Sequence, residues 1–502
     1  MDALNYLGMG FSTALTLDNL VFCFLGVLIG TLIGVLPGIG PVATMAILTP
    51  FTFAMEPTGA IIMLCGIYYG AQYGGSTTSI LVNIPGEVGS IVTCLDGYQM
   101  ARQGRAGPAL GISAIGSFIG GTLSVVGLML LTPPLARLAI NFGPPELFSL
   151  ILFGLIMVSS LGTGSMVKCL IMATLGMVAS TIGMEDVSGY ARFTMGSLTI
   201  ADGLTLVAVV VGMFGITEVL SNVEAMGKQE IYKADIRNIF PSLQDWIAAR
   251  WAIVRGSLLG FFLGTFPGGG TVITTFLSYW LEKRLSKHPE KFGSGAIEGV
   301  AGPETANNAS VSGAMVPLLA LGLPSHVVMA MLLGAFIIHG IEPGPFFISR
   351  HPDLFWGVIA SMYIGNVMLL VLNLPLIGMW VRILKIPYPL LFPLIILLCL
   401  IGVYSLNNNS WELGIMIIFG IIGYFLRKME YPPAPFLLAM VLGPMMETSF
   451  RQSMLIARGD PAIFIRRPFS AVILTFVVIV LLVSAFLRAK KPNGGAIESD
   501  FD

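Results

Sequence analysis

The chain has 502 residues, of which 55% are hydrophobic and only 11% are charged, and its mean hydropathy is +0.87. A soluble globular domain usually carries about 25% charged residues, so the composition excludes that class, and a formal net charge of −1 argues against a nucleic-acid partner. Runs of roughly 20 apolar residues recur along the chain and predict an all-α polytopic membrane protein.

The first apolar run, residues 20–36, stops at Pro37 and Gly38, with Gly40 close behind, and then resumes to residue 53. Proline and neighbouring glycines interrupt the hydrogen-bond ladder of a helix. We therefore expect residues 20–53 to form a helical hairpin that folds back at these residues. Two ordinary spans joined by a tight turn are the alternative.

A segment rich in Gly, Ser and Thr, residues 68–87, follows inside an apolar region. We expect it to break the membrane helix and to present substrate-binding groups. The candidates are Gly74, Gly75, Ser76, Thr77, Thr78 and Asn83. Further spans are expected at about 107–131, 144–160, 166–183 and 200–221, which completes a first unit over residues 18–225.

The glycine pattern of residues 26–40 returns at residues 256–270. A constant shift of 230 positions pairs Gly26, Gly30, Gly34, Pro37, Gly38 and Gly40 with Gly256, Gly260, Gly264, Pro267, Gly268 and Gly270. A fixed internal period indicates two copies of one unit. We expect a second hairpin over residues 254–281, turning at Pro267, Gly268 and Gly270.

The second unit, residues 246–460, follows a cytoplasmic link at 226–245 and contains its own polar break at 303–325, with the candidates Asn307, Asn308, Ser310 and Ser325. Pro85 pairs with Pro324 at a shift nine residues larger than that of the hairpins. Spans are expected at about 354–373, 389–405, 411–427 and 433–449, then an extra one at 468–487 before a disordered tail, 488–502. The total is about 11–12 spans.

The positions of Lys and Arg predict that corresponding loops of the two units face opposite sides of the membrane. The link and the second hairpin's exit are basic, whereas the first hairpin's exit carries no Lys or Arg. This pattern favours two inverted-topology repeats, with a periplasmic N-terminus and a cytoplasmic C-terminus. One loop disagrees, because Arg451, Arg458, Arg466 and Arg467 fall where an outside loop is expected. Either the topology differs there, or these side chains meet an acidic partner or substrate.

Broken helices would give this protein its chemistry. The free N–H groups of a helix end attract a carboxylate, and free C=O groups can coordinate Na⁺, which would place Na⁺ near residues 37–40 and 267–270. The alternative is that Gly and Ser only let helices approach closely. No nucleophile–base, metal or P-loop motif of an enzyme is present. We expect a secondary carrier, with a passive channel or pore for small organic anions as the alternative.

Seven short segments in both halves, together with the repeated hairpins and polar segments described above, carry a resemblance to a known family. Over roughly residues 18–460 the sequence resembles the large membrane subunit of the tripartite tricarboxylate transporter family. The matching segments are GVLPGIGP at 34–41, YYGAQYGGS at 68–76, NIPGE at 83–87, DGYQMARQGRAG at 96–107, FPGGG at 266–270, SYWLEK at 278–283 and EGVAGPETANNA at 298–309. Near Pro324 the family pattern tends to read PGS, where this chain has Ser325 and His326.

The resemblance implies secondary active uptake of a di- or tricarboxylate, or a related organic acid, across the bacterial inner membrane. The driving force would be a gradient of Na⁺ or H⁺, and no cofactor is implied. Two protein partners are expected in the lipid bilayer and periplasm: a small membrane subunit and a periplasmic solute-binding protein. An elevator-like motion is the expected mechanism.

Overall fold

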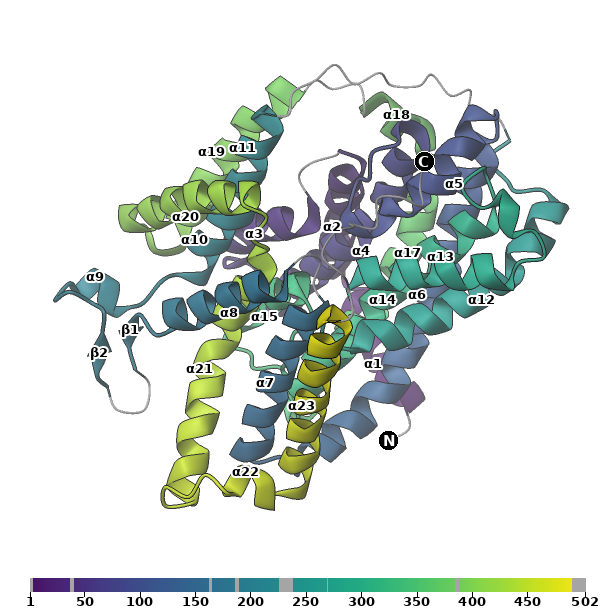
Figure 1. The fold of residues 1–502 in the computed structure, drawn as a ribbon. Helices are drawn as coiled ribbons and strands as arrows, with labels where there is room; N and C mark the ends of the chain where they lie inside the picture. Colours follow the sequence, from purple (N-terminus) through teal and green to yellow (C-terminus); the bar gives the residue numbers. More distant parts are fainter. Residues whose placement is uncertain are drawn as a thin grey trace.

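The structure is a computed structural model that describes residues 3–36, 40–161, 165–185, 189–224, 238–268, 270–383 and 388–489. Most of these residues are helical (Figure 1), and their strands form one small antiparallel hairpin of β1 (Gly183–Met184) and β2 (Ala191–Arg192), in which Gly183 pairs with Arg192. The expected all-α class is confirmed.

Six helical stretches of the described residues are long and apolar enough to cross a membrane: Leu17–Val35, Ala106–Ala139, Leu206–Glu224, Leu243–Thr265, Pro352–Asn373 and Ser410–Lys428. Shorter apolar helices cover Pro144–Ser160, Met166–Ser180, Val327–Ile338, Phe392–Asn407 and Pro468–Val483. The chain is therefore a multi-pass membrane protein.

The first half begins with α1 (Ala3–Ala14), which the sequence had not indicated. It continues with α2 (Leu17–Val35), α3 (Gly40–Thr52), α4 (Pro57–Val82), the 3₁₀ turn η1 (Val88–Ile91), α5 (Thr93–Arg102), α6 (Ala106–Ala139), α7 (Pro144–Leu161) and α8 (Met166–Ser180). After the β hairpin come α9 (Leu198–Ala201), α10 (Leu206–Val210), the π-helical η2 (Val211–Ile216) and α11 (Thr217–Glu224).

The second half begins with α12 (Leu243–Thr265), whose N-cap Ser242 forms a capping box with Asp245. It continues with α13 (Thr271–Leu285), η3 (Pro289–Lys291), α14 (Glu298–Leu321), α15 (Val327–Ile338), α16 (Phe347–Arg350), α17 (Pro352–Asn373) and α18 (Ile377–Ile383). The last helices are α19 (Tyr388–Asn407), α20 (Ser410–Lys428), α21 (Pro433–Ile456), α22 (Ile463–Arg466) and α23 (Pro468–Ala489). Most of the expected link, and the tail beyond residue 489, lie outside the described residues.

The breaks expected in residues 68–87 and 303–325 are shorter than those segments and lie at their ends. Helix α4 runs unbroken to Val82 and α14 to Leu321. The hydroxyl groups cause no break because they bond back within their own helix: Ser76 donates to the carbonyl of Tyr73 (2.8 Å) and Ser310 to that of Asn307 (2.7 Å). The interruptions are confined to residues 83–87 and 322–326.

The glycine stripe packs in the same way in both halves. A methyl group on Gly30 of α2 would overlap the carbonyl oxygen of Ile67 on α4, and one on Gly260 of α12 would overlap that of Ala306 on α14. The flanking glycines repeat this relation: Gly26 and Gly34 face Met63 and Ala71, while Gly256 and Gly264 face Gly302 and Ser310. The facing positions of α4 and α14 differ by a constant 239 residues, so the internal repeat extends to packing.

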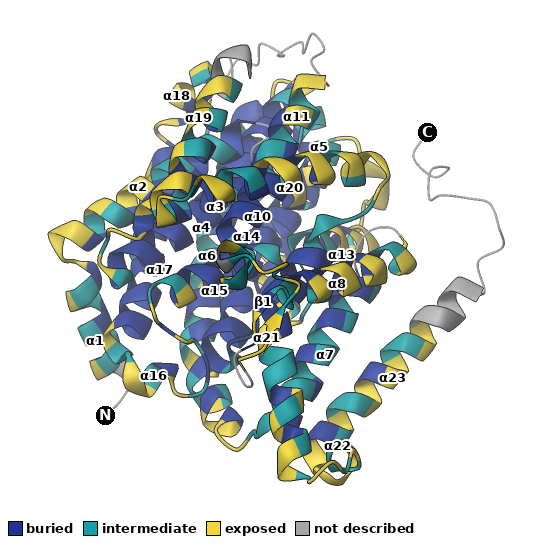
Figure 2. Cartoon of the chain, turned by 90° about the vertical axis from the view of Figure 1, so that its left-hand side faces the viewer, coloured by how far each residue is buried: buried dark blue, intermediate teal, exposed yellow. Residues whose placement is uncertain are grey.

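The two halves meet through α4 and α14, which are buried along almost their whole length (Figure 2). Helix α6 of the first half packs on α14, and α17 of the second half packs on α4. In the same way α5 contacts α14, and α15 contacts α4. The centre of the molecule is therefore built from equivalent elements that exchange contacts across the two halves.

Candidate functional site between the two halves

Helices α4 and α14 end in the same backbone conformation. Asn83 and Gly322, which the shift of 239 pairs, are C-caps in the left-handed region, with φ of 59° and 71°. After a proline in each half, the chain reaches the N-cap of the next helical element, which is Glu87 before η1 and His326 before α15. Both breaks are thus short connections of one geometry.

The carboxylate of Glu87 is buried and surrounded by hydrogen-bond donors. Asn307 of α14 donates from Nδ2 to Oε1 (2.9 Å), and the backbone N–H of Gly89 donates to Oε2 (2.7 Å). The side-chain nitrogen of Gln72 on α4, in the amide orientation that satisfies its neighbours, also donates to Oε1 (2.9 Å). Donors from both halves therefore hold this carboxylate in place.

The bond between Asn307 and Glu87 has a counterpart across the interface. The Tyr68 hydroxyl and Nε2 of His326 share a hydrogen bond of 3.1 Å. The same shift of 239 that pairs Tyr68 with Asn307 also pairs Glu87 with His326. Each half therefore sends one polar side chain from its long helix to the N-cap of the other half.

A second buried carboxyl group, Glu304 of α14, lies in the same region. The Thr93 hydroxyl of α5 donates to its Oε1. Its Oε2 has no hydrogen-bond partner among the described residues, although the Ser113 side chain of α6 lies beside the group. Glu304 is fully buried, so an ionised carboxylate here would be costly.

Of the predicted substrate-binding residues, Asn307, Asn308 and Ser325 have polar atoms placed for a role beyond packing. Asn308 donates to the hydroxyl oxygen of Ser117 (2.7 Å), and its Oδ1 has no partner in the described chain. Asn308 also lines a cavity of about 20 Å³ with Tyr73 and other side chains. Ser325 is 1% exposed, and its hydroxyl likewise has no partner there.

The other predicted residues lie in packing positions. Gly74 faces the backbone of α2, Gly75 faces the Glu87 side chain, and the Thr78 hydroxyl donates to the Val35 carbonyl at the end of α2 (2.8 Å). Ser76 and Ser310 bond within their helices, Thr77 is buried, and Asn83 is exposed. Whether any of these contacts a substrate stays a prediction.

The second expected hairpin tip lies against the second break. Gly268 has φ of +77°, a value that suits glycine, and its N–H donates to the Ser325 carbonyl (2.9 Å). Gly270 is the N-cap of α13, and Pro267 follows the C-cap of α12. In the first hairpin Gly40 has φ of +65°, while Pro37 and Gly38 lie outside the described residues.

Sequence reasoning did not propose Tyr68, Gln72 or Thr93 for the site. Gln72 follows Tyr68 by four positions, so one face of α4 carries both. Applying the shift of 239 to Asn307 would have found Tyr68, because an equivalent residue of an internal repeat occupies an equivalent place. No comparable pattern marks Thr93.

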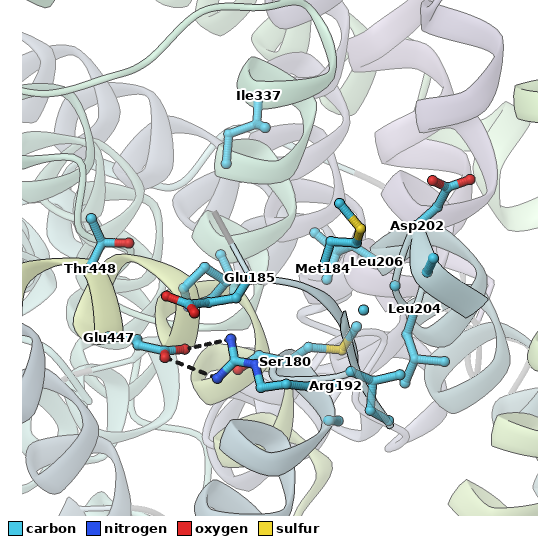
Figure 3. A pocket seen from close by; sticks show the side chains of 18 residues that line it. Ser180, Met184, Glu185, Arg192, Asp202, Leu204, Leu206, Ile337, Glu447 and Thr448 are labelled. Carbon is cyan, nitrogen blue, oxygen red and sulfur yellow. Dashed lines mark hydrogen bonds and ion pairs between the residues drawn. The ribbon is translucent and has the colours of Figure 1, made fainter. Parts of the chain in front are cut away.

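A separate pocket of about 290 Å³ lies between α8, the β hairpin and α21 (Figure 3). Arg192 donates to both oxygens of Glu447 (2.9 and 3.1 Å), and Nε of Arg451 lies 2.9 Å from Glu447 and 3.3 Å from Glu185. Asp202 also lines the pocket, so the acidic side chains at this place outnumber the two arginines and the pocket offers no excess positive charge to an organic anion. Arg451 was expected in a loop on the outer side of the membrane, where a positive charge is unusual. The structure gives it acidic partners within the chain.

Sequence comparison agrees with this architecture and defines a class, that of membrane subunits of tripartite carriers. The chain belongs to the tripartite tricarboxylate transporter TctA family, whose profile matches residues 20–438. It is similar to an uncharacterized 52.8 kDa protein in the TAR-I ttuC' 3' region of Agrobacterium vitis, with 50% identity over 495 residues and 98% of each chain covered. A protein in the TAR-II ttuC' 3' region of that organism is 51% identical over 234 residues, which is 46% of this chain and 97% of the relative. No solved structure matched.

Proposed function

We propose that this chain is a secondary active symporter that imports an organic carboxylate delivered by a periplasmic binding protein, with a small membrane subunit as its second partner. Family membership supports transport of this substrate class. The observation that carries the proposal is the buried polar centre, where Asn307 and Glu87 bond across the two halves beside Tyr68 and His326. An elevator-like movement of inverted repeats in the bacterial inner membrane would expose such a centre to each side in turn.

The driving ion of this proposal is Na⁺ or H⁺, and Glu304 favours the proton. A protonated carboxyl group needs fewer donors than a carboxylate. Glu304 has the hydroxyls of Thr93 and Ser113 beside it, and only that of Thr93 at hydrogen-bond geometry, whereas Glu87 accepts from Asn307, Gly89 and Gln72. Two neighbouring carboxyl groups in a low-dielectric interior also disfavour each other's ionisation. Glu87 and Cys94 interact electrostatically with Glu304. The helices packed on α14 also carry the charged or titratable groups Asp96, Arg255, Tyr279 and Glu282 in this region.

Arg255 and Glu282 form an ion pair, with Arg255 Nε 2.7 Å from Glu282 Oε1. Asp96 accepts hydrogen bonds from three backbone N–H groups of the loop before α14 and from Tyr279. These charged neighbours are therefore satisfied by other partners. Among these groups at the centre, Glu304 is the one whose carboxyl oxygen Oε2 has no hydrogen-bond partner in the described residues, which makes it the candidate proton carrier of the proposed cycle.

Uptake of labelled citrate or succinate into proteoliposomes tests the function. The chain is reconstituted with its small subunit, and the cognate binding protein is added outside under an imposed Na⁺ or pH gradient. Uptake should require both the gradient and the binding protein. Uptake at channel-like rates without a gradient would instead support a passive pore.

The proton assignment is tested with Glu304→Gln. This variant should lose uptake driven by a pH gradient by at least tenfold while it retains exchange of labelled for unlabelled substrate. Ser257→Ala on the adjacent α12, where the side chain bonds within its own helix, is the matched control. Wild-type uptake that responds to Na⁺ alone, or an unchanged Glu304→Gln profile, would refute the proton assignment.

A further inference from the structure

The two equivalent N-caps of the breaks differ in one chemical respect. In the first half, the Glu87 carboxylate caps its own helical turn by accepting the backbone N–H of Gly89. In the second half, the equivalent N-cap is His326, and its side chain makes no capping hydrogen bond to α15. Helix α15 has 12 residues, so its first turn presents N–H groups and a partial positive charge without a carboxylate.

The two N-cap residues have similar backbone dihedral angles. Glu87 has φ −144° and ψ 167°, and His326 has φ −158° and ψ 178°. The neighbouring donors also correspond, because Asn307 reaches Glu87 just as Tyr68 reaches His326. The second half therefore has the backbone and a neighbouring polar group that surround the Glu87 carboxylate in the first half, but an imidazole stands in place of the carboxylate.

An independent observation at the same place also points to a ligand. Ser325, the residue directly before the N-cap, is 1% exposed, and its hydroxyl has no hydrogen-bond partner among the described residues. Five buried hydroxyls of the described residues lack a partner, and Ser325 is the one of them that lies outside a helix, next to a helix N-terminus. The carbonyl of Ser325 accepts the N–H of Gly268, which fixes this residue against the turn between α12 and α13. His326 is only half-buried, so a small molecule can reach this helix terminus.

We propose that the first turn of α15, with Ser325 and Tyr68, binds one carboxylate group of the transported acid in the position that the Glu87 carboxylate occupies in the first half. This inference rests on the proposed function and names its binding site. The ligand carboxylate accepts hydrogen bonds from the backbone N–H groups of Val327 and Val328 and from the hydroxyls of Ser325 and Tyr68. In the first half the side chain of Glu87 already occupies the equivalent position, so the same ligand cannot bind there.

The test places a carboxylate into the second half. His326→Glu should cap α15 from within the chain, and His326→Gln is the matched control of similar size without charge. Binding of citrate and of succinate to the purified chain is measured by isothermal titration calorimetry. We expect His326→Glu to weaken binding at least 30-fold relative to His326→Gln, and Ser325→Ala to weaken it about 3- to 10-fold, the size of one hydrogen bond. Equal affinities of the Glu and Gln variants would overturn the site.

A second measurement separates this inference from the proposed function. Without any ligand, His326→Glu should melt at a higher temperature than His326→Gln, because a carboxylate at this N-cap completes the helix terminus. If neither acid binds the wild type but the Glu variant is stabilised, the capping position stands and the assigned substrate class fails. If the Glu variant melts at or below the Gln variant, α15 has no carboxylate position and the inference fails.

Discussion

Helices α4 and α14 share their packing but differ in their chemistry. Both lie against a glycine stripe, on α2 and α12 respectively, and both end in a left-handed C-cap. Equivalent positions of the two halves nevertheless hold different residues. Tyr68 of α4 corresponds to Asn307 of α14, and Glu87, which follows α4, corresponds to His326, which follows α14. The comparison teaches that the repeat conserves backbone approach, whereas the side chains at the centre have been free to diverge.

This division has a physical reason. A carbonyl oxygen of α4 or α14 occupies the place where a Cβ atom on the facing glycine would stand, so the stripe cannot change without moving backbone. A hydrogen bond across the interface requires only some donor and some acceptor of suitable length. Two halves with one scaffold can therefore carry different polar side chains at equivalent positions of the centre.

The largest expected effect comes from breaking the shared packing. Gly30→Leu and Gly260→Leu each force a side chain into the backbone of the facing helix, and overpacking of a tight contact costs about 1–3 kcal/mol or more. Both variants should lose most of the monodisperse protein peak in fluorescence-detected size-exclusion chromatography, to a similar extent.

Gly414→Leu is the control, because nothing lies within 4 Å of a Cβ at that helical glycine of α20. It should behave as the wild type. A normal peak for one of the two stripe variants and loss for the other would show that the equivalence of the halves does not extend to stability.

A smaller effect should distinguish the two crossing hydrogen bonds. Asn307→Leu deprives the Glu87 carboxylate of a donor, and hydrogen bonds to charged groups contribute about 1.5–3 kcal/mol. Tyr68→Phe removes the bond to His326, which as a neutral pair contributes about 0.5–1.5 kcal/mol. Thermal unfolding in detergent should therefore show the larger loss for Asn307→Leu. An equal or reversed order would mean that Glu87 is not ionised.

Much of the helical scaffold could be predicted from the sequence. The shift of 230 that pairs Gly26 with Gly256 marks α2 and α12, and the apolar runs give most of the later helices close to their observed bounds. The extent of the breaks in the polar segments is harder to predict, because Gly, Ser and Thr in water favour turns. In a buried helix the same residues allow close approach and bond to the preceding turn, as Ser76 and Ser310 do.

The candidate site could be predicted only in part. Asn307 and Ser325 follow from polarity inside an apolar region, and the structure places both near the centre. The partner of Asn307, Glu87, lies 220 positions away in the sequence. Such long-range pairs depend on how the two halves pack together, which the sequence does not give. The contrast between Glu87 and His326 acquires meaning only after the two N-caps are known to share one backbone geometry.

The smallest expected effect concerns the charged pocket of Figure 3, where the halves also meet but closer to solvent. The side chains of Arg192 and Glu447 are 28% and 25% exposed. Because water screens such a pair, a double-mutant cycle of Arg192→Gln and Glu447→Gln should give a coupling energy of about 0.5–1 kcal/mol in thermal or chemical unfolding.

Arg466 and Asp460 provide the matched control, since their side chains are 75% and 44% exposed and the pair lies within one half. The same cycle there should give a coupling near zero. A coupling at Arg192 and Glu447 well above the stability loss of Asn307→Leu would mean that this pocket, rather than the bond between Asn307 and Glu87, is the stronger polar contact between the halves.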